Sequence, residues 1–331
     1  MKAYIKKIEC YLPEIIEETP KERLKKRLGI NSRHVCPDGE IASDIAVKAA
    51  EKLFANGVDR NKIDYLLLCI QTPDYFLPTT ACIVQDRLGL SKNIGAMDYS
   101  LGCSGFVYGL GLAKGLIETG QAKNVLLLTT AAYCKYINKK DGAVRPLIGD
   151  GAAATLISAE DVEKEGISGF VYGTDGTGAG HLILPVGGMK YPPEETPFEE
   201  STDKYGNYRT NRNVFMSGAG IMEFSLENVP GLVDSVLEKN NLSREEVDYF
   251  VFHQASRIIL ENLRIKCGLE NRPYWMDMAE YGNTVASTIP IALRDMMIAN
   301  PDMKLEKVML AGFGVGLSWS GCIVDLSKVI K

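Results

Sequence analysis

Short apolar runs alternate with helical patterns along most of the chain. Five runs have the length and the aliphatic or aromatic content of buried strands. They span residues 65–70, 125–130, 153–157, 249–252 and 308–311. Apolar residues recur at helical spacing over residues 41–53 and 229–237. Because strands that alternate with helices pack into sheets covered by those helices, we expect an α/β protein with mostly buried sheets.

Two parts of the chain resemble each other at a nearly constant offset. Residues 60–68 match residues 244–252 at an offset of 184, and a second, three-residue match lies at an offset of 183. Matches this short also arise by chance. If they reflect a repeat, the chain consists of two similar halves, residues 1–165 and 166–331, packed about a pseudo-twofold axis.

The composition is that of an ordinary globular protein. The 331 residues include 37 Lys and Arg against 42 Asp and Glu, a net charge of −5, and 46% are hydrophobic. A chain of this length and apolar content can bury a large core, which excludes the disordered, collagen-like and disulfide-scaffold classes. The mildly acidic pI of about 5.5 argues against a nucleic-acid partner, because phosphate contacts need a basic face.

The sequence carries no sign of export or of a membrane partner. Residues 1–13 lack the continuous apolar stretch of a signal peptide. The longest uncharged run, residues 308–324, contains four glycines and suits a turn between strands better than a membrane span. Eight cysteines are scattered without CxxC spacing, as small buried hydrophobes are in a reducing compartment. We therefore expect a cytoplasmic protein.

Two segments interrupt the alternating pattern. Residues 20–33 carry six Lys and Arg with Leu24 and Leu28 at helical spacing, which fits either a solvated helix face or a surface that docks phosphates or an acidic partner. Residues 186–215 are rich in Pro, Glu, Tyr and Asn and are long for a loop. Loops of this length are often lids or interface arms, and we expect this insertion to shape a substrate entrance.

Cys103 is the cysteine best placed for chemistry. It stands between Gly102 and Gly105, where an extended apolar segment meets a helix-like stretch. At a helix N-terminus the dipole and the free backbone N–H groups favour a thiolate. The N–H of Cys103 can also face the oxyanion that forms when the thiolate attacks a thioester carbonyl. The alternative is a packed core cysteine, the commoner role of a cysteine between glycines.

His253 and Asn283 lie where functional side chains are expected. His253 directly follows the run 249–252 and would emerge at the carboxyl end of a strand, the usual place for functional groups in α/β proteins. A satisfied core histidine is the alternative. Asn283 lies in a glycine turn before the helix-like residues 289–297, where a plain Asx turn or helix cap is the alternative. One half of the repeat would thus supply the nucleophile, and the other His and Asn.

Five short motifs follow one another along the chain. They are Gly102-Cys103-Ser104-Gly105-Phe106, Gly149-Asp150-Gly151-Ala152-Ala153, His253-Gln254-Ala255, Gly282-Asn283-Thr284 and Gly312-Phe313-Gly314-Val315-Gly316. Together they resemble the thiolase superfamily, most closely the β-ketoacyl-acyl-carrier-protein synthase III enzymes. The resemblance covers nearly the whole chain. It implies the five-layered α-β-α-β-α thiolase fold, a homodimer and an acyltransferase that needs no metal or redox cofactor.

The resemblance also implies a role for each motif residue. Cys103 would be acylated by a primer, and the backbone N–H groups of Cys103 and Val315 would form an oxyanion hole. The family usually has Gly at the position of Val315, but a backbone donor survives that change. His253, as a neutral imidazole, and Asn283 would donate hydrogen bonds to the malonyl thioester oxygen while CO2 leaves.

Several positions depart from the family pattern. Arg27 matches a substrate-binding arginine, but the tryptophan that often precedes it is absent. Gly142 replaces a common arginine, and Ser256 replaces the Asn that follows His-Gln-Ala. Leu77 stands before Pro78, where the family often has a Phe that reaches into the partner's acyl pocket. Coenzyme A and a carrier protein therefore both remain possible primer carriers.

The resemblance implies decarboxylative condensation of an acyl primer with malonyl carrier protein, in the synthesis of fatty acids or of related acyl or polyketide products. The expected partners are an acyl carrier protein, an acyl-coenzyme A or acyl-carrier primer, and a second copy of the chain. Two alternatives stay open. One is transfer of the acyl group from Cys103 to a hydroxyl or amine without loss of CO2. The other is a non-catalytic protein that binds the carrier.

Overall fold

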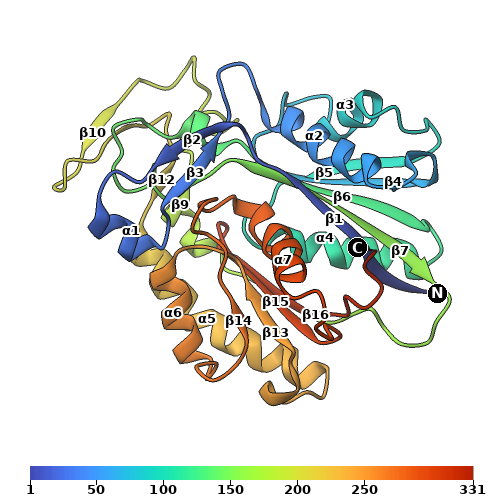
Figure 1. The fold of residues 1–331 in the computed structure, drawn as a ribbon. Helices are drawn as coiled ribbons and strands as arrows, with labels where there is room; N and C mark the ends of the chain where they lie inside the picture. Colours follow the sequence, from blue (N-terminus) through green and yellow to red (C-terminus); the bar gives the residue numbers. More distant parts are fainter. Residues whose placement is uncertain (331) are drawn as a thin grey trace.

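The computed structural model describes residues 1–330 and contains two five-stranded sheets (Figure 1). The first sheet has the order β1 (Lys2–Tyr11), β7 (Gly151–Glu160), β6 (Asn124–Ala131), β4 (Tyr65–Ile70) and β5 (Gly95–Tyr99). The second has the order β8 (Ile167–Thr174), β16 (Ser318–Val324), β15 (Val308–Gly314), β13 (Tyr249–Phe252) and β14 (Tyr274–Trp275). All five strand-like runs predicted from the sequence lie in these sheets.

The two sheets have the same internal arrangement. In the first, β4 runs parallel to β5 and β6, whereas β7 pairs antiparallel with both β6 and β1. In the second, β13 runs parallel to β14 and β15, whereas β16 pairs antiparallel with both β15 and β8. Strands β4 and β13 therefore hold equivalent positions, as do β6 and β15, which are the pairs that the sequence offsets match. The prediction of two similar halves is confirmed.

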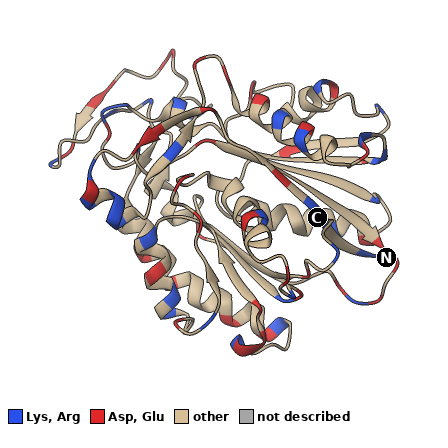
Figure 2. Ribbon diagram, viewed as in Figure 1, with Lys and Arg blue, Asp and Glu red and all other residues tan. Residues whose placement is uncertain are grey.

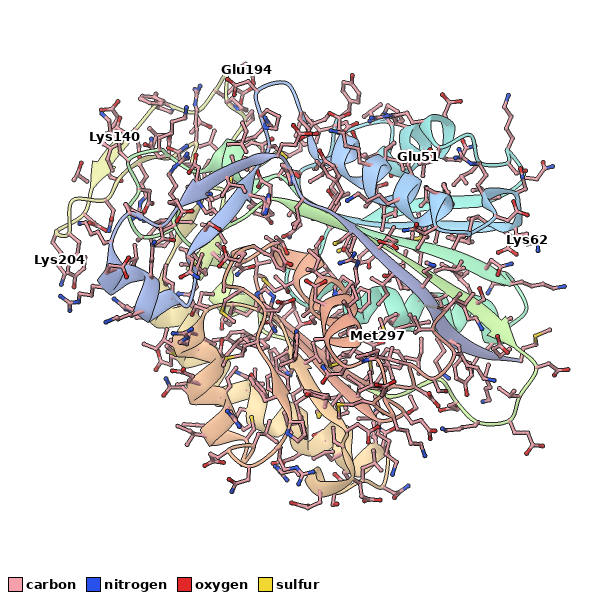
Figure 3. All side chains as sticks on the ribbon, viewed as in Figure 1. Glu51, Lys62, Lys140, Glu194, Lys204 and Met297 are labelled. Atoms are coloured by element: carbon pink, nitrogen blue, oxygen red, sulfur yellow. The ribbon has the colours of Figure 1, made fainter. Side chains whose placement is uncertain are left out.

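Helices cover the outer face of each sheet and fill the space between the sheets. The central helices are α4 (Gly105–Glu118) and α7 (Thr288–Ala299), which share one apolar cluster with strands of both sheets. Met297 of α7, labelled in Figure 3, packs against this cluster. Helices α2 (Ala42–Ala55) and α3 (Thr80–Arg87) cover the first sheet, and α5 (Gly218–Lys239) and α6 (Arg257–Lys266) cover the second. The layers are α-β-α-β-α, the predicted thiolase fold.

Burial on both faces explains why the strands are apolar throughout. Leu66 and Leu68 of β4 point into the outer cluster with α2, whereas Leu67 points into the central cluster. In the same way Phe250 and Phe252 of β13 face α5 and α6, and Val251 faces the centre. Successive side chains of a strand point to opposite faces, so a strand between two helical layers needs apolar residues at every position.

The remaining elements lie around one end of the sheets. Helix α1 (Glu22–Leu28) ends at Gly29, whose φ of +74° and N–H bond to the Lys25 carbonyl form a left-handed cap. It is flanked by the ribbon of β2 (Ile15–Glu18) and β3 (Ser32–Val35). Two further pairs join β9 (Leu182–Ile183) to β12 (Phe215–Met216) and β10 (Glu200–Thr202) to β11 (Tyr208–Thr210).

Two sequence expectations differ from the structure or are refined by it. The helical pattern at 229–237 is only the second half of α5, which begins at Gly218 and continues through Pro230. The uncharged run 308–324 forms β15 and β16, joined by a glycine turn as expected. Among the helices within residues 1–330, none has the length and apolar content to cross a membrane.

Candidate active site

One cavity of about 910 Å³ brings together residues from both halves of the chain. Six of the seven residues expected at the site line it, namely Cys103, His253, Asn283, Val315, Arg27 and Ser256. The seventh, Leu77, is 82% exposed and lies outside this lining. Since the resemblance placed Leu77 in the pocket of a partner chain, a surface position on its own chain is compatible with that expectation.

Cys103 lies in the loop between β5 and α4, where the glycine-rich end of β15 crosses it. A Cβ atom on Gly314 would lie 2.7 Å from the Cys103 sulfur, and one on Gly312 would lie 2.8 Å from the Cys103 carbonyl oxygen. Real Cβ atoms do not approach that closely, so these two positions require glycine for the second half to reach the cysteine. The glycines of the motif therefore bring the two halves together at Cys103.

The sulfur of Cys103 is buried and contacts backbone donors. The N–H groups of Val315 and of Cys103 itself donate hydrogen bonds to it. Burial raises the pKa of the Cys103 thiol to about 12, and these two donors lower it only in part. The start of α4 was expected to favour the thiolate. Burial outweighs that effect, so the thiol is protonated at neutral pH.

His253 follows β13 directly, as predicted, and is almost completely buried. Its Nδ1 lies 2.7 Å from the Thr288 hydroxyl, and its ring packs edge-to-face with the Phe313 ring at a centroid distance of 5.6 Å. Burial lowers the pKa of His253 to about 3, because the interior disfavours the charged imidazolium. The imidazole is therefore neutral in the physiological pH range.

Asn283 is held by its backbone and by its side-chain oxygen. Its N–H donates to the Leu147 carbonyl at 2.9 Å, and its own carbonyl accepts from the Gly149 N–H at 3.0 Å. Gly282 precedes it at a φ of +67°, a conformation that favours glycine. The Asn283 Oδ1 accepts from the Val285 N–H at 2.9 Å, which leaves the amide Nδ2 3.4 Å from the His253 Nε2.

The His253 Nε2 and Asn283 Nδ2 are spaced to bind one oxygen. Two nitrogens 3.4 Å apart can each lie about 2.9 Å from a shared oxygen, an ordinary N–H···O distance. Both groups are neutral and buried, where a hydrogen bond to a developing negative charge is strong. The arrangement can therefore stabilise an enolate or oxyanion in the cavity that holds Cys103.

The charged residues that line the cavity are all cations. Lys21, Arg23 and Arg27 come from α1 and its N-terminal flank, and Lys140 comes from the loop after β6. Figure 2 shows Lys and Arg along most of α1. A cavity lined by charges of one sign attracts ligands of the opposite sign. Of the two functions considered for the basic run 20–33, phosphate or acidic-partner docking is the one this position favours.

The tip of the 186–215 insertion forms part of the same wall. Tyr205 and Asn207, which lie between β10 and β11, line the cavity together with Lys140. Figure 3 labels Lys140 and Lys204 on this side of the molecule, opposite Glu51 and Lys62. The insertion thus contributes residues to the lining, as expected for a segment that shapes an entrance.

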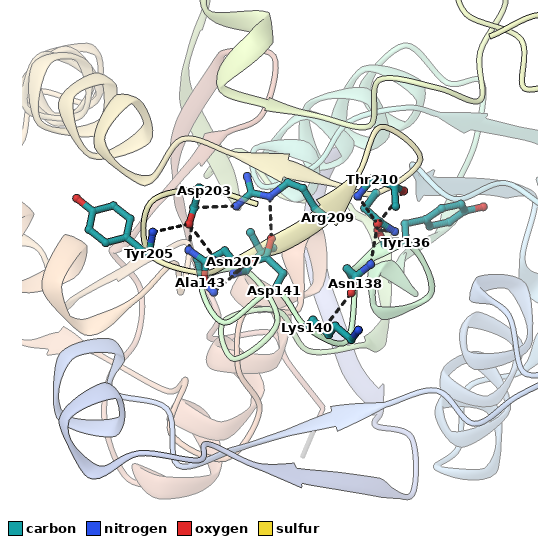
Figure 4. Close-up of polar contacts among 12 residues, drawn as sticks. Tyr136, Asn138, Lys140, Asp141, Ala143, Asp203, Tyr205, Asn207, Arg209 and Thr210 are labelled. Atoms are coloured by element: carbon teal, nitrogen blue, oxygen red, sulfur yellow. Dashed lines mark hydrogen bonds and ion pairs between the residues drawn. The ribbon is translucent and has the colours of Figure 1, made fainter. Parts of the chain in front are cut away.

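A buried ion pair fixes this wall, as Figure 4 shows. The Asp141 carboxylate accepts from the backbone N–H groups of Ala143 and Val144 at 2.9 and 3.0 Å, and it lies 3.2 Å from the Arg209 Nε of β11. Asp141 is only 1% exposed, so loss of its partner would leave a buried charge unpaired. One carboxylate therefore holds both the 140–144 loop and the β10–β11 hairpin.

Two residues that contact the site, Tyr133 and Thr288, were not predicted from the sequence, and Phe313 was named only as a member of the glycine motif at residues 312–316. Tyr133 follows β6 and packs against Cys103, and its hydroxyl donates to Gln71, which directly follows β4. Both lie just past the carboxyl ends of strands, the signal that pointed to His253. Thr288 begins α7 and had the appearance of an ordinary helix-start residue.

Within residues 1–330 no three His, Cys, Asp or Glu side chains group as metal ligands.

Comparisons with known proteins agree on one family. The family 3-oxoacyl-[acyl-carrier-protein] synthase III matches residues 97–176, and its C-terminal region matches residues 237–326. The β-ketoacyl-[acyl-carrier-protein] synthase III of Caldanaerobacter subterraneus subsp. tengcongensis is 32% identical over 328 residues, 96% of each chain. That of Lactococcus lactis subsp. cremoris SK11 is 35% identical over 315 residues, 94% of this chain and 92% of the relative.

Solved structures extend the agreement to three dimensions. A crystal structure of a 3-oxoacyl-(acyl-carrier-protein) synthase III superposes with a TM-score of 0.95 at 44% identity, over 98% of this chain and all of the other. The enzyme from Burkholderia xenovorans LB400 gives 0.88 at 30% identity, over 99% and 95% of the two chains. The fold is thus that of a thiolase-type acyltransferase of the condensing class. Within that class, the chain belongs to the 3-oxoacyl-[acyl-carrier-protein] synthase III family, which confirms the resemblance.

Replacing Gly314 by alanine should push the two halves apart at Cys103. The new Cβ would overlap the Cys103 sulfur, so we expect a loss of about 1–3 kcal/mol in the free energy of unfolding. Urea denaturation measures that loss. Intact-protein mass spectrometry measures the acylation of Cys103. We expect its rate to fall at least about tenfold, the effect of raising the activation barrier by roughly 1.4 kcal/mol. Gly115→Ala is the control, because nothing lies within 4 Å of its added Cβ. Acylation of Gly314→Ala at the wild-type rate would contradict the close approach.

The raised pKa of Cys103 predicts slow alkylation at neutral pH. With a pKa of about 12, the thiolate fraction and hence the iodoacetamide rate should rise about tenfold per unit from pH 7 to pH 9 without a plateau. Peptide mapping separates Cys103 from the exposed Cys82. A rate that levels off below pH 8 would show that burial does not control this thiol.

Proposed function

We propose that this member of the family joins an acyl primer to a malonyl unit, with Cys103, His253 and Asn283 as the catalytic residues. The observation that carries the proposal is the cavity in which a buried cysteine from one half meets two neutral donors from the other. The expected product is a β-ketoacyl thioester on an acyl carrier protein, made for fatty acids or for related acyl or polyketide chains.

In the first half-reaction Cys103 takes the primer. Its sulfur attacks the thioester carbonyl, and the developing oxyanion accepts from the N–H groups of Cys103 and Val315, both of which lie against the sulfur. The bond between the acyl carbon and the carrier sulfur then breaks. Because the Cys103 thiol begins protonated, its proton ends on the departing carrier thiol, and no net proton is released.

In the second half-reaction the malonyl thioester oxygen lies between His253 and Asn283. The bond to the carboxylate breaks, CO2 leaves, and the electron pair forms an enolate whose oxygen accepts from both side chains. The enolate carbon attacks the acyl group on Cys103, the carbon–sulfur bond breaks, and the cysteine leaves as a thiolate that takes up one proton from solvent to restore the thiol. Each donor aimed at such an oxygen contributes about 2.7–4 kcal/mol to lowering the barrier. Because both reactants are held in one cavity, proximity supplies much of the remainder.

The cationic lining supports a carrier with a phosphate group. Lys21, Arg23, Arg27 and Lys140 offer charge complementary to phosphate, and Ser256 offers a hydroxyl beside them. Coenzyme A and the prosthetic group of a carrier protein both carry a phosphate, so this lining accommodates either primer carrier. An acidic carrier protein would also be attracted to the basic face of α1.

We propose a homodimer built on the free edge of β5. Strand β5 pairs only with β4, and unpaired edges recruit further strands. Three large residues that are exposed on the nearby loop are Tyr75, Phe76 and Leu77. The loop is tied to β5 because the Thr80 N–H donates to the Asp98 carboxylate at 3.2 Å. A second copy on this edge would cover these side chains and could take Leu77 into its own acyl pocket.

The cytoplasm is the compartment we propose for this enzyme. All eight cysteines are free, and seven of them are buried. Free cysteines of this number fit a reducing compartment, where disulfides do not persist.

Single-residue variants should separate the two half-reactions. We expect Cys103→Ala to gain no acyl mass from a panel of acyl-coenzyme A and acyl-carrier thioesters but still to release CO2 from malonyl carrier protein. His253→Ala should accept the acyl group yet release CO2 about 10²- to 10³-fold more slowly. Intact-protein mass spectrometry and a CO2 assay measure the two steps.

His34→Gln is the control for these variants, because His34 lies outside the cavity lining. Normal decarboxylation by His253→Ala would contradict the proposed roles. An acyl group on wild-type Cys103 that a hydroxyl or amine removes, but malonyl carrier protein does not, would favour simple acyl transfer. A protein that binds carrier but gains no acyl mass would favour the non-catalytic alternative.

Charge on the β5 edge should split the proposed dimer. Met97 is 38% exposed in the middle of β5, so Met97→Glu should convert a dimer into monomers in sedimentation velocity experiments. Met303→Glu is the matched control, since Met303 is 45% exposed elsewhere on the chain. A wild-type monomer at micromolar concentration would contradict this interface.

A further inference from the structure

One tyrosine ends the cavity on the side of Cys103 that faces the first sheet. Tyr133 begins the short 3₁₀ turn that follows β6, lines the cavity, and packs against Cys103 and Val285. Its hydrogen-bond partner, Gln71, lies outside the lining, at the start of the loop between β4 and α3. The Tyr133 side chain therefore stands between the cavity and that loop.

The ring of Tyr133 is fixed in this position by its hydroxyl, which donates to the Gln71 Oε1. Burial raises the pKa of the Tyr133 phenol, so the hydroxyl is a neutral donor. If the ring turned aside, the hydroxyl would lose its acceptor and remain unpaired in a buried place, which is costly. The ring is therefore a firm wall of the cavity.

The space beside Gly102, the residue before Cys103, is closed from the same side. The Gln71 Oε1 lies 2.7 Å from the position that a Cβ on Gly102 would take, and the Val285 Cγ1 lies 3.4 Å from it. The Val315 side chain also packs against this position. Even one further carbon atom does not fit there, so this wall has no slack beside the ring of Tyr133.

The proposed reaction leaves one direction for the chain of the primer. It places the oxyanion at the N–H groups of Cys103 and Val315, and the malonyl unit at His253 and Asn283. The primer carrier departs along the cationic lining, and the malonyl carrier then enters by the same route. A primer chain folded back along that route would block the malonyl unit. The chain is therefore directed toward Tyr133.

We infer that Tyr133, fixed by Gln71, sets the length of the primer and restricts it to a short acyl chain. The inference rests on the proposed function, because it concerns the acyl group that Cys103 would carry. It gives the Tyr133 hydroxyl no part in the chemistry, since that proton is already donated to Gln71.

The wild-type protein provides the first test. Acetyl, butyryl and octanoyl thioesters, each on coenzyme A and on carrier protein, are offered singly, and intact-protein mass spectrometry measures the rate of Cys103 acylation. We expect the octanoyl rate to lie at least about 100-fold below the acetyl rate, because even one methylene too many for a pocket costs roughly 10- to 200-fold. Equal acetyl and octanoyl rates would overturn the inference.

Shortening the side chain at position 133 tests the residue itself. Tyr133→Ala removes the ring that ends the cavity, so the ratio of octanoyl to acetyl acylation should rise at least about tenfold. Tyr133→Leu keeps apolar packing but is too short to reach Gln71, and it should raise the ratio by a smaller factor. The leucine variant decides the question if the alanine variant does not fold. A wild-type ratio in the folded variants would overturn the inference.

Tyr136→Ala is the matched control. Tyr136 ends the same 3₁₀ turn, but it is 38% exposed and lies outside the cavity lining. Loss of its ring should leave the ratio of octanoyl to acetyl acylation unchanged. An equal rise in Tyr136→Ala and Tyr133→Ala would overturn the inference, because it would show that any loosening of the turn admits the longer chain.

The outcomes separate this inference from the proposed function. A wild-type protein that gains no acyl mass from any thioester, or an acyl group on Cys103 that malonyl carrier protein does not remove, would refute the proposed function. Normal acylation and removal, with a preference for chain length that does not change when Tyr133 is replaced, would refute only the role of Tyr133.

Discussion

The close approach of the β15 end to Cys103 is the contact on which the site depends. Gly312 and Gly314 leave room for one half of the molecule to lie against Cys103 of the other, and the next residue, Val315, then directs its N–H to the sulfur. Neither half contains all the proposed catalytic groups. The five layers and the shared central cluster of α4 and α7 hold the two sheets at the spacing that this contact requires. The fold is therefore a means of joining a cysteine to a histidine and an asparagine.

Burial has opposite effects on the two titratable residues of the site. It raises the pKa of Cys103 to about 12 and lowers that of His253 to about 3, because the interior disfavours both the thiolate and the imidazolium. Both side chains are therefore neutral before substrate binds. In the proposed reaction, the negative charge that forms would meet preorganised neutral donors in a poorly solvated cavity, where such donors are effective. The strained backbone of Val285 belongs to the same arrangement, since it orients the amide of Asn283.

Much of this could be predicted from the sequence because the decisive features are local. The runs that became β4 and β13 are apolar at every position since both faces are buried, and His253 follows a strand directly. Other features depend on residues distant in sequence. The contact between Thr288 and His253 spans 35 positions, and a threonine at the start of a helix has no distinctive local pattern. The anchoring of the 186–215 insertion by Asp141 was equally hidden, because an ion pair between two loops leaves no periodicity. The effect of burial on the pKa of Cys103 could not be predicted either, because it depends on the three-dimensional surroundings. The helix that begins after Cys103 could be predicted from the sequence.

The central claim is that one substrate oxygen lies between the donors of the second half while the cysteine of the first half faces the reacting carbon. A crystal structure with a malonyl thioester analogue, in which a sulfonate replaces the carboxylate and cannot leave as CO2, tests it most directly. The account predicts a thioester oxygen within about 3.2 Å of both the His253 Nε2 and the Asn283 Nδ2, with the central carbon directed toward Cys103. An analogue bound in the cavity with its thioester oxygen away from both nitrogens would contradict the account.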